Sequence, residues 1–155
     1  TPTKIAGLND VRDVTVGNNN AFAIKNDGAL WAWGDNTYGQ LGGGSPSFSV
    51  NPTPAMVPGL LNVAGVAPGY SYVVALKTDG TLWGWGQNLF FPALYTATQI
   101  TGVPASKQVA SGSSHSAALT NAGSRSSAGP TFRATGHGVP PRSTSSVAFS
   151  PASVA

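Results

Sequence analysis

The chain has 155 residues and a formal net charge of +3; 8% of its residues are charged and 41% are hydrophobic. This length fits a single domain. The complete absence of cysteine excludes disulfide frameworks, thiolate metal sites and cysteine nucleophiles. No apolar run of about 18 residues occurs, so we expect no membrane-spanning helix and no membrane insertion. No signal-peptide pattern is visible, and the composition leaves the compartment open.

Short alternating apolar segments separated by turn-forming residues predict an all-β protein. The chain contains 20 glycines and 12 prolines, and no segment has the periodicity of a long helix. The glycines also mark an internal repeat, because a glycine opens each copy and another follows eleven residues later. The pairs are Gly17 with Gly28, Gly69 with Gly80, and Gly112 with Gly123.

The copies are spaced 52 and then 43 residues apart, which divides residues 1–123 into units near 7–58, 59–101 and 102–123. A period near 50 residues is typical of propellers or solenoids. Within each unit the pattern predicts a hairpin. In the second copy Tyr72–Lys77 is a strand, residues 78–80 form the turn and residues 81–85 return, because Asp-Gly supplies the positive φ of a tight turn.

After its hairpin the first copy continues with Gly-Asp-Asn-Thr-Tyr-Gly-Gln-Leu-Gly, residues 34–42. The second copy keeps Gly86-Gln-Asn88 and then departs into Leu-Phe-Phe-Pro. Residues 45–54 are rich in Ser, Pro and Thr and are expected to form a surface loop. Since residues 43–56 and 87–99 differ most between copies, we expect function to lie in these two loops.

Taken together, the Asp-Gly turn, Trp-x-Trp-Gly-x-Asn and Gly-Gln-Leu-Gly resemble the regulator of chromosome condensation repeat family. The resemblance covers residues 1–123, with two nearly full repeats and a partial third. It implies a β-propeller, whose closed form has about seven blades of four strands each. We therefore expect a partial propeller of about two to three blades built from four-stranded units. Low charge and Asn/Thr/Ser richness look like bacterial or phage members, which are often surface-exposed or secreted.

Residues 124–155 form a tail rich in Ser, Pro and Arg, with no tryptophan after Trp85 and no alternating pattern beyond Leu119. One interpretation is an irregular, disordered tail. The other is a frameshift, because dropping one base from codons for residues 132–138 permits Ser-Gly-Gln-Leu-Gly-Thr-Gly. The nucleotide sequence distinguishes the two.

Most residues that could carry chemistry have a structural interpretation in this pattern. The four tryptophans recur at equivalent positions, which favours packing over the stacking of sugars or bases. They are Trp31, Trp33, Trp83 and Trp85. Asp27 and Asp79 belong to Asp-Gly turns rather than to an acid pair. The remaining acids are Asp10, Asp13 and Asp35, and no glutamate exists, so paired-carboxylate hydrolysis is poorly supported.

Metal and nucleophile sites find equally little support. His115 and His137 are the only histidines, too few for zinc without cysteine or glutamate. Ser113–Ser116 surround His115, but no orienting acid is recognisable for a serine hydrolase. Residues 18–20 with Asp35 and Asn36 offer oxygen atoms without calcium-loop spacing. Gly42–Gly44 is a flexible loop rather than a phosphate cradle, because no Lys-Ser/Thr or helix follows it.

The sequence therefore predicts no catalytic, cofactor-binding or metal-binding residue and no cofactor. Its basic residues are scattered, which disfavours nucleic-acid binding. We expect a non-enzymatic propeller segment that acts as a protein-interaction or surface-binding platform, with a protein partner or self-assembly completing the propeller. Two alternatives stay open. One is a guanine nucleotide exchange factor or chromatin-binding module, as in some members of the family; the other is a truncated repeat fragment without autonomous function.

Overall fold

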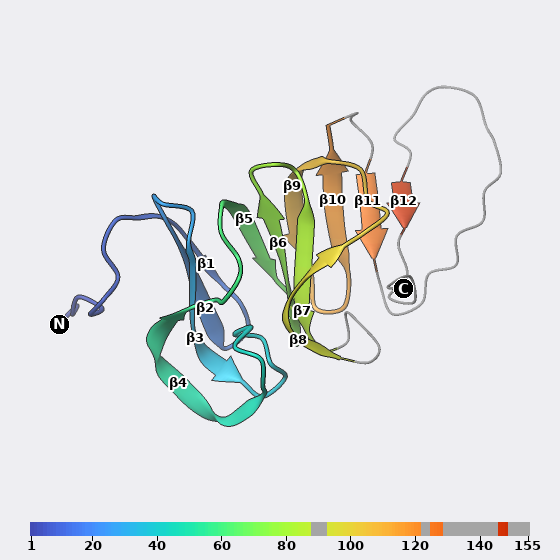
Figure 1. Ribbon diagram of the computed structural model, residues 1–155. Coiled ribbons are helices and arrows are strands. Elements are labelled where there is room, and N and C mark those ends of the chain that lie inside the picture. Colours follow the sequence, from blue (N-terminus) through green and yellow to red (C-terminus); the bar gives the residue numbers. More distant parts are fainter. Residues whose placement is uncertain (88–92, 122–124, 129–145, 149–155) are drawn as a thin grey trace, which may run out of the picture.

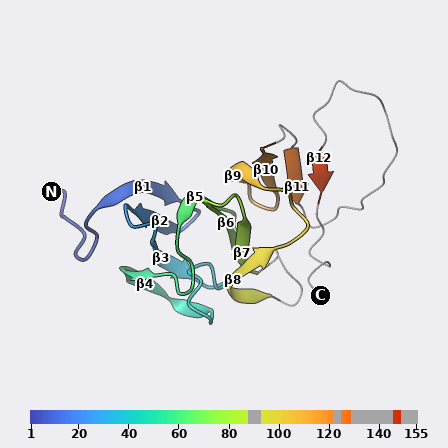
Figure 2. The same cartoon turned by 45° about the horizontal axis from the view of Figure 1, so that its top comes forward.

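The computed structural model describes residues 1–87, 93–121, 125–128 and 146–148, and these residues form three four-stranded sheets. No helix long and apolar enough to cross a membrane occurs in this described part. The sheets follow one another in chain order, from blue through green to orange-red (Figure 1), and they keep this order in the turned view (Figure 2). The all-β prediction with four-stranded units is confirmed.

Sheet 1 contains β1 (Val11–Val16), β2 (Asn20–Lys25), β3 (Leu30–Asn36) and β4 (Ser47–Met56), in that spatial order. Sheet 2 contains β5 (Val63–Pro68), β6 (Tyr72–Lys77), β7 (Leu82–Gly86) and β8 (Leu94–Ile100), also in order. Sheet 3 contains β9 (Ser106–Ser111), β10 (Ser116–Thr120), β11 (Arg125–Ala128) and β12 (Ser146–Ala148). All strand pairs are antiparallel except β11 with β12.

The predicted hairpins are confirmed, and the Asp-Gly turns act as expected. Gly28 and Gly80 have φ values of +81° and +85°. The carboxylate of Asp79 accepts hydrogen bonds from both the backbone N–H and the hydroxyl of Thr81. Such a bond to a residue two positions ahead is the turn role of aspartate. The turns also join the sheets, since the N–H of Val63 donates to the Gly28 carbonyl at 3.0 Å.

The core lies between the sheets, because alternate residues of each strand point to opposite faces. One cluster joins Phe22, Ile24 and Leu30 of sheet 1 to Val73 and Trp85 of sheet 2. A second cluster joins the opposite face of sheet 2 to sheet 3; it includes Tyr72, Val74, Leu76, Leu82, Ile100 and Ala118. Sheet 2 is therefore covered on both faces.

A small residue recurs at one position of each repeat, as Ala23, Ala75 and Ala118. Ala23 and Ala75 are fully buried and Ala118 is 2% exposed. All three lie on the second strand counted from the first edge strand of their sheet. Ala75 belongs to the cluster between sheets 1 and 2, and Ala118 belongs to the cluster between sheets 2 and 3. A larger side chain at Ala75 or Ala118 would have to push the neighbouring sheet away.

The prediction of a surface loop over residues 45–54 is wrong, because β4 spans Ser47–Met56. β4 is an outer edge strand that pairs only with β3, and the pairing shifts register near Gly34. An edge strand tolerates Pro52 and Pro54 and needs no buried face, so the alternation that marks inner strands is missing. The predicted variable loop over residues 87–99 is likewise wrong from Leu94 onward, where β8 begins.

The sequence shows no alternating pattern beyond about Leu119, yet two short strands follow in the described part of the chain. β11 pairs with β10 in a register that places Arg125 opposite Leu119, and β12 pairs with β11. Within the segment 124–155 the described residues are those of these two strands. The pairing uses main-chain groups, so the polar sequence of β11 gave no sign of it. Residues 132–138, on which the frameshift hypothesis depends, lie outside the described residues together with His137.

Candidate protein-interaction surface

Three repeat-opening turns, one from each sheet, gather at the same end of the molecule. They connect β1 with β2, β5 with β6 and β9 with β10. Together they surround a hollow of about 230 Å³. We call this surface the glycine-turn face; its lining residues are Val16, Gly17, Asn18, Pro68, Gly69, Tyr70, Gly112 and Ser113. No charged side chain belongs to this lining.

The same main-chain hydrogen bond closes each of these turns. The N–H of the opening glycine donates to the carbonyl three residues later, from Gly17 to Asn20 at 2.9 Å and from Gly69 to Tyr72 at 2.8 Å. Glycine is required because the side chain three residues later lies directly against it. A methyl group on Gly17 would lie 2.2 Å from Oδ1 of Asn20. The repeated glycine thus fixes the geometry of this face.

Hydrogen bonds also fix sheet 2 against sheet 3 at this end. The Tyr72 hydroxyl donates to the Gly112 carbonyl at 3.1 Å, and the Ser111 hydroxyl donates to the Ala67 carbonyl at 2.9 Å. The Ser116 hydroxyl lies 2.9 Å from that of Ser111 and donates to Tyr72 at 3.2 Å. Ser116, one of the serines around His115 that might suggest a hydrolase, therefore joins the sheets together with Ser111, and His115 itself is exposed.

Sheets 1 and 2 meet near this face through two tyrosines. The rings of Tyr38 and Tyr70 have centroids 5.9 Å apart with a tilt of 43°. The N–H of Gln87 donates to the Tyr38 carbonyl at 3.1 Å. Tyr70 nevertheless keeps 49% of its surface exposed. It presents an aromatic ring beside a polar hollow.

The oxygen-bearing residues considered for calcium are used within the fold instead. Asp35 accepts hydrogen bonds from the backbone and hydroxyl of Thr37 and from the side chain of Gln40. Asn36 accepts from the N–H of Leu41 at 2.9 Å. Among the residues that the structure describes, no group of three or more His, Cys, Asp or Glu side chains could hold a metal ion.

The hydrogen bonds around Asp35 also set its ionisation. Partial burial raises the pKa of Asp35, but the hydrogen bonds from Thr37, Gln40 and the Asn36 backbone together hold this pKa below its usual value. The carboxylate is therefore ionised at neutral pH. Its function here is to hold the loop of residues 34–42 in shape.

The tryptophans occupy two kinds of site. Trp85 is fully buried, and its indole N–H donates to the Gln40 carbonyl at 2.7 Å. The ammonium nitrogen of Lys25 lies 5.0 Å from the ring centroid of Trp31, and that of Lys77 lies 5.2 Å from the ring centroid of Trp83. Trp33 is only partly buried, and a hollow of about 250 Å³ lies beside it and residues 17–21. Trp85 thus has the packing role favoured by the repeat.

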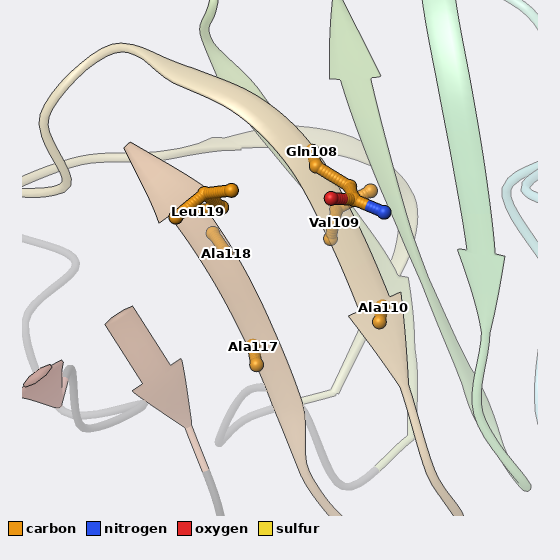
Figure 3. A pocket seen from close by; sticks show the side chains of 6 residues that line it. All are labelled: Gln108, Val109, Ala110, Ala117, Ala118 and Leu119. Carbon is orange, nitrogen blue, oxygen red and sulfur yellow. The ribbon is translucent and has the colours of Figure 1, made fainter. Parts of the chain in front are cut away.

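A third hollow, of about 210 Å³, lies over β9 and β10 and was not foreseen from the sequence. Figure 3 shows its lining of small apolar side chains around Gln108. Ala117 stands here at the repeat position that holds Phe22 in sheet 1 and Val74 in sheet 2. The smaller side chain at this position was the one feature of the sequence that could have indicated the hollow. The hollow offers no ionisable side chain to a ligand.

Comparison with known proteins identifies the repeats. Residues 11–40 and residues 27–76 match the family described as Regulator of chromosome condensation (RCC1) repeat. The human probable E3 ubiquitin-protein ligase HERC6 is 38% identical over 92 residues, which are 57% of this chain and 9% of that protein. The human E3 ubiquitin-protein ligase HERC2 is 33% identical over 138 residues, 77% of this chain and 3% of that protein. The ultraviolet-B receptor UVR8 of Arabidopsis thaliana is 32% identical over 88 residues, 56% of this chain and 20% of the receptor.

Two solved structures share the arrangement of sheets. Prp20p from Saccharomyces cerevisiae superposes with a TM-score of 0.71 at 27% identity, covering 79% of this chain and 34% of Prp20p. Human WBSCR16 gives a TM-score of 0.73 at 23% identity, covering 82% of this chain and 35% of that protein, and supports the fold alone. The chain thus spans a small part of each curated relative and about a third of each solved propeller.

Proposed function

Because the chain is built from regulator of chromosome condensation repeats that fold as blades of a β-propeller, we propose that it is a non-enzymatic protein-interaction segment. The partner contacts the glycine-turn face. The observation behind this proposal is that three equivalent turns, one from each sheet, line one polar hollow. Loops held by a rigid scaffold are a common place for binding residues.

The turns combine a constant framework with variable exposed residues. Their glycines and closing hydrogen bonds repeat, whereas the residues after the glycines differ: Asn18, Tyr70 and Ser113. Tyr70 offers a large amphipathic surface at small entropic cost, and tyrosine is enriched where proteins bind each other. Since the lining of the hollow carries no charge, hydrogen bonds and aromatic contact, not ion pairing, provide the affinity.

Prp20p was described together with its binding to Gsp1p and histones. An exchange-factor or chromatin role is the second candidate for this chain, but the charges favour it less. Histones are basic and bind best to acidic surfaces, whereas this chain has eight basic and five acidic residues. The interaction platform therefore stands as our first proposal.

Site-specific photo-crosslinking tests the proposed surface. A photoreactive phenylalanine at Tyr70, which is 49% exposed, is compared with one at Leu61, which is 55% exposed. Leu61 precedes β5 and Tyr70 follows it, so the two probes lie at opposite ends of this strand. We expect discrete crosslinked proteins from Tyr70 alone in lysates of the source cells. Equal labelling at both positions, or none at Tyr70, would contradict the proposal.

Purified Gsp1p and histones test the second candidate directly. We expect that neither Gsp1p nor histones bind the unmodified chain more tightly than they bind a Tyr70→Ala variant. Histone binding that weakens steeply with salt, or faster nucleotide release from Gsp1p, would instead support the chromatin or exchange-factor role. A chain without a cooperative melting transition would support the fragment without autonomous function.

A further inference from the structure

The segment that follows β3 is longer in the first repeat than in the second. Gly34 lies 25 residues before Gly59, whereas its counterpart Gly86 lies 16 residues before Gly102. Part of this extra length is in the outer edge strand, since β4 has ten residues and β8 has seven. The first repeat therefore carries structure on this edge that the repeat pattern itself does not require.

Two β-bulges interrupt the pairing of β4 with β3. In each, β4 advances four residues while β3 advances two. The bulge at residues 52–54 is shared with sheet 2, where residues 95–97 of β8 form it opposite the equivalent step of β7. The bulge at residues 48–50, which we call the edge bulge, has no counterpart in the described residues of sheets 2 and 3. Such a bulge turns side chains away from the regular ladder.

The edge bulge exposes two large apolar side chains. Phe48 is 92% exposed and Val50 is 70% exposed. In the equivalent strand β8 the exposed residues are polar, Thr96 and Gln99. Sheet 2 has a neighbouring sheet on each face and β8 is still an edge strand, so neighbouring sheets do not cover this margin. The exposed pair belongs to β4 at the outer margin of sheet 1 (Figure 1, Figure 2), and apolar side chains exposed together mark an interaction site.

Polar side chains hold the edge bulge in shape. The hydroxyl of Ser47 accepts from the N–H of Ser49 and donates to its carbonyl, both at 3.3 Å, and the Asn51 side chain donates to the same carbonyl at 3.0 Å. Ser49 stands between Phe48 and Val50, so these bonds fix the backbone that carries both apolar side chains. A surface fixed before binding loses less conformational freedom when a partner binds.

The same bonds disfavour the addition of a partner strand to this edge. Strand addition uses free main-chain N–H and C=O groups. Both groups of Ser49 are bonded to side chains of β4 itself, and Pro52 and Pro54 have no N–H to donate. Recognition of this edge therefore depends on side chains, not on main-chain pairing.

The sequence around the edge bulge carries no charge. Asp35 and Lys77 are the nearest charged residues along the chain. An anionic membrane surface attracts lysine and arginine, so this segment lacks the attraction that would hold it on such a surface. The centre of a protein interface, in contrast, is poor in charge and rich in aromatic residues. An uncharged apolar surface on a protein is therefore the chemical match.

We propose that the edge bulge is a contact site for a protein partner with an uncharged apolar pocket. Phe48 enters the pocket and Val50 packs at its rim. A buried aromatic ring of this kind carries a large share of the binding free energy at many interfaces. The site lies on β4, whereas the glycine-turn face is built from the turns that connect β1 with β2, β5 with β6 and β9 with β10. The inference therefore does not depend on the proposed function.

Photo-crosslinking with the full chain, in lysates of the source cells, finds the partner. A photoreactive phenylalanine replaces Phe48 or, as the control, Met56, which is 51% exposed and lies at the other end of the same strand. We expect a crosslinked protein that is specific to position 48. The absence of such a product, or the same product from both positions, would overturn the proposal.

The protein captured through position 48 is then purified and titrated against single variants. We expect Phe48→Ala to weaken binding about tenfold or more, and Met56→Ala to change it by less than about twofold. Asn51→Ala, which removes a donor to the Ser49 carbonyl, should weaken binding to an intermediate degree. The affinity should stay nearly constant between about 0.05 and 0.5 M sodium chloride, because no ion pair contributes. Equal binding of the unmodified chain and Phe48→Ala, or a steep loss with salt, would contradict the proposed contact.

The folding of Phe48→Ala provides a separate readout. Because the ring is 92% exposed, this variant should unfold at the same urea concentration as the unmodified chain. An unchanged midpoint together with weakened binding supports a contact role for the ring. A lowered midpoint would assign the ring to the fold and overturn the proposal.

Light scattering and vesicle sedimentation test two competing occupants. We expect no self-association of the chain that depends on Phe48, and no sedimentation with vesicles of phosphatidylcholine and phosphatidylserine. An oligomer that Phe48→Ala abolishes would overturn the proposal in favour of a second copy. Vesicle binding that Phe48→Ala abolishes would overturn it in favour of a membrane surface.

Discussion

Glycine serves two separate purposes at the scale of single residues. Gly28 and Gly80 have positive φ and bring the hairpin turn against the start of the next sheet. Gly17 and Gly69 lack a positive φ and are needed because the side chain three residues later leaves no room for a methyl group. Glycine is thus required by its backbone conformation in the Asp-Gly turns and by close packing in the repeat-opening turns.

The first prediction concerns the hairpin turn. In Gly28→Ala the new methyl group would lie 2.9 Å from the Cα of Asn62 at a φ of +81°. We expect the free energy of unfolding to fall by about 1–3 kcal/mol, measured by urea denaturation. Gly65→Ala is the control, because its methyl group meets nothing within 4 Å; a loss equal to that of Gly28→Ala would contradict the explanation.

The second prediction concerns acid sensitivity. The pKa of Asp35 is lower in the folded chain than its ordinary value. The ionised carboxylate therefore stabilises the fold above the unfolded pKa of about 4, and this contribution is lost as the pH falls through the lower folded pKa. We expect the melting temperature of Asp35→Asn to depend less on pH between about 6 and 2 than that of the unmodified chain.

Asp13→Asn is the matched control for the acid experiment. Asp13 is exposed on β1 and lies outside the hydrogen-bonded loop of residues 34–42. This variant should keep the pH dependence contributed by Asp35. A pH dependence that is unchanged in Asp35→Asn would show that the loop does not need the ionised carboxylate.

At the scale of elements, a polar loop covers an apolar ring. The loop of residues 34–42 uses its Asp, Asn and Gln side chains for internal hydrogen bonds. These bonds leave the Gln40 carbonyl free to accept from Trp85 of the next sheet. The loop therefore connects two sheets through its shape, which bonds among its own side chains and backbone help to fix.

The third prediction compares the two equivalent tryptophans. Trp85→Ala removes a fully buried ring, so we expect a loss of about 3–5 kcal/mol in the free energy of unfolding. Trp33→Ala should cost less than half as much, because no loop of the described residues covers that ring and Trp33 is only partly buried. Trp85→Phe keeps the chain folded while removing the hydrogen bond to Gln40, at a cost of about 1–3 kcal/mol. Equal losses at both alanine variants would contradict the different coverage of the two rings.

At the scale of the whole molecule, the three described sheets form a row, and within this row only sheet 2 has neighbours on both faces (Figure 1). Hydrogen bonds between sheets follow the same order. The Gly28 carbonyl accepts from Val63, and the Gly80 carbonyl accepts from Ser106. Stability in such an array depends on the interfaces between neighbours. The middle sheet benefits from two interfaces and each outer sheet from one.

The fourth prediction follows for amide hydrogen exchange. We expect β6 to exchange most slowly, because local opening of sheet 2 disrupts two interfaces, whereas opening of sheet 1 or sheet 3 disrupts one. Mass spectrometry of exchanged peptides from β2, β6 and β10 measures this order. These three strands are inner strands of their sheets and so serve as matched references. Slower exchange in β2 or β10 than in β6 would contradict the prediction.

The sequence predicted the structure correctly where the conformation of a residue depends only on its neighbours in the chain. Asp79-Gly80 predicted a hairpin because the turn chemistry is local. β4 was missed because an exposed edge strand needs no alternation and accepts proline. The glycine-turn face was missed for a different reason. Its residues lie about 50 positions apart, and only the stacking of sheets brings Gly17, Gly69 and Gly112 together.

The interface between sheets 1 and 2 has a directional consequence. Its two sides are unlike, since one contributes a Gly-Gln-Leu-Gly loop and the other a tryptophan. A twofold contact between two surfaces of the tryptophan kind would bring tryptophan against tryptophan and leave both without a loop. Only head-to-tail contact places a loop against each tryptophan, and head-to-tail contact either closes into a ring or continues without end. The row of described sheets therefore has a polarity.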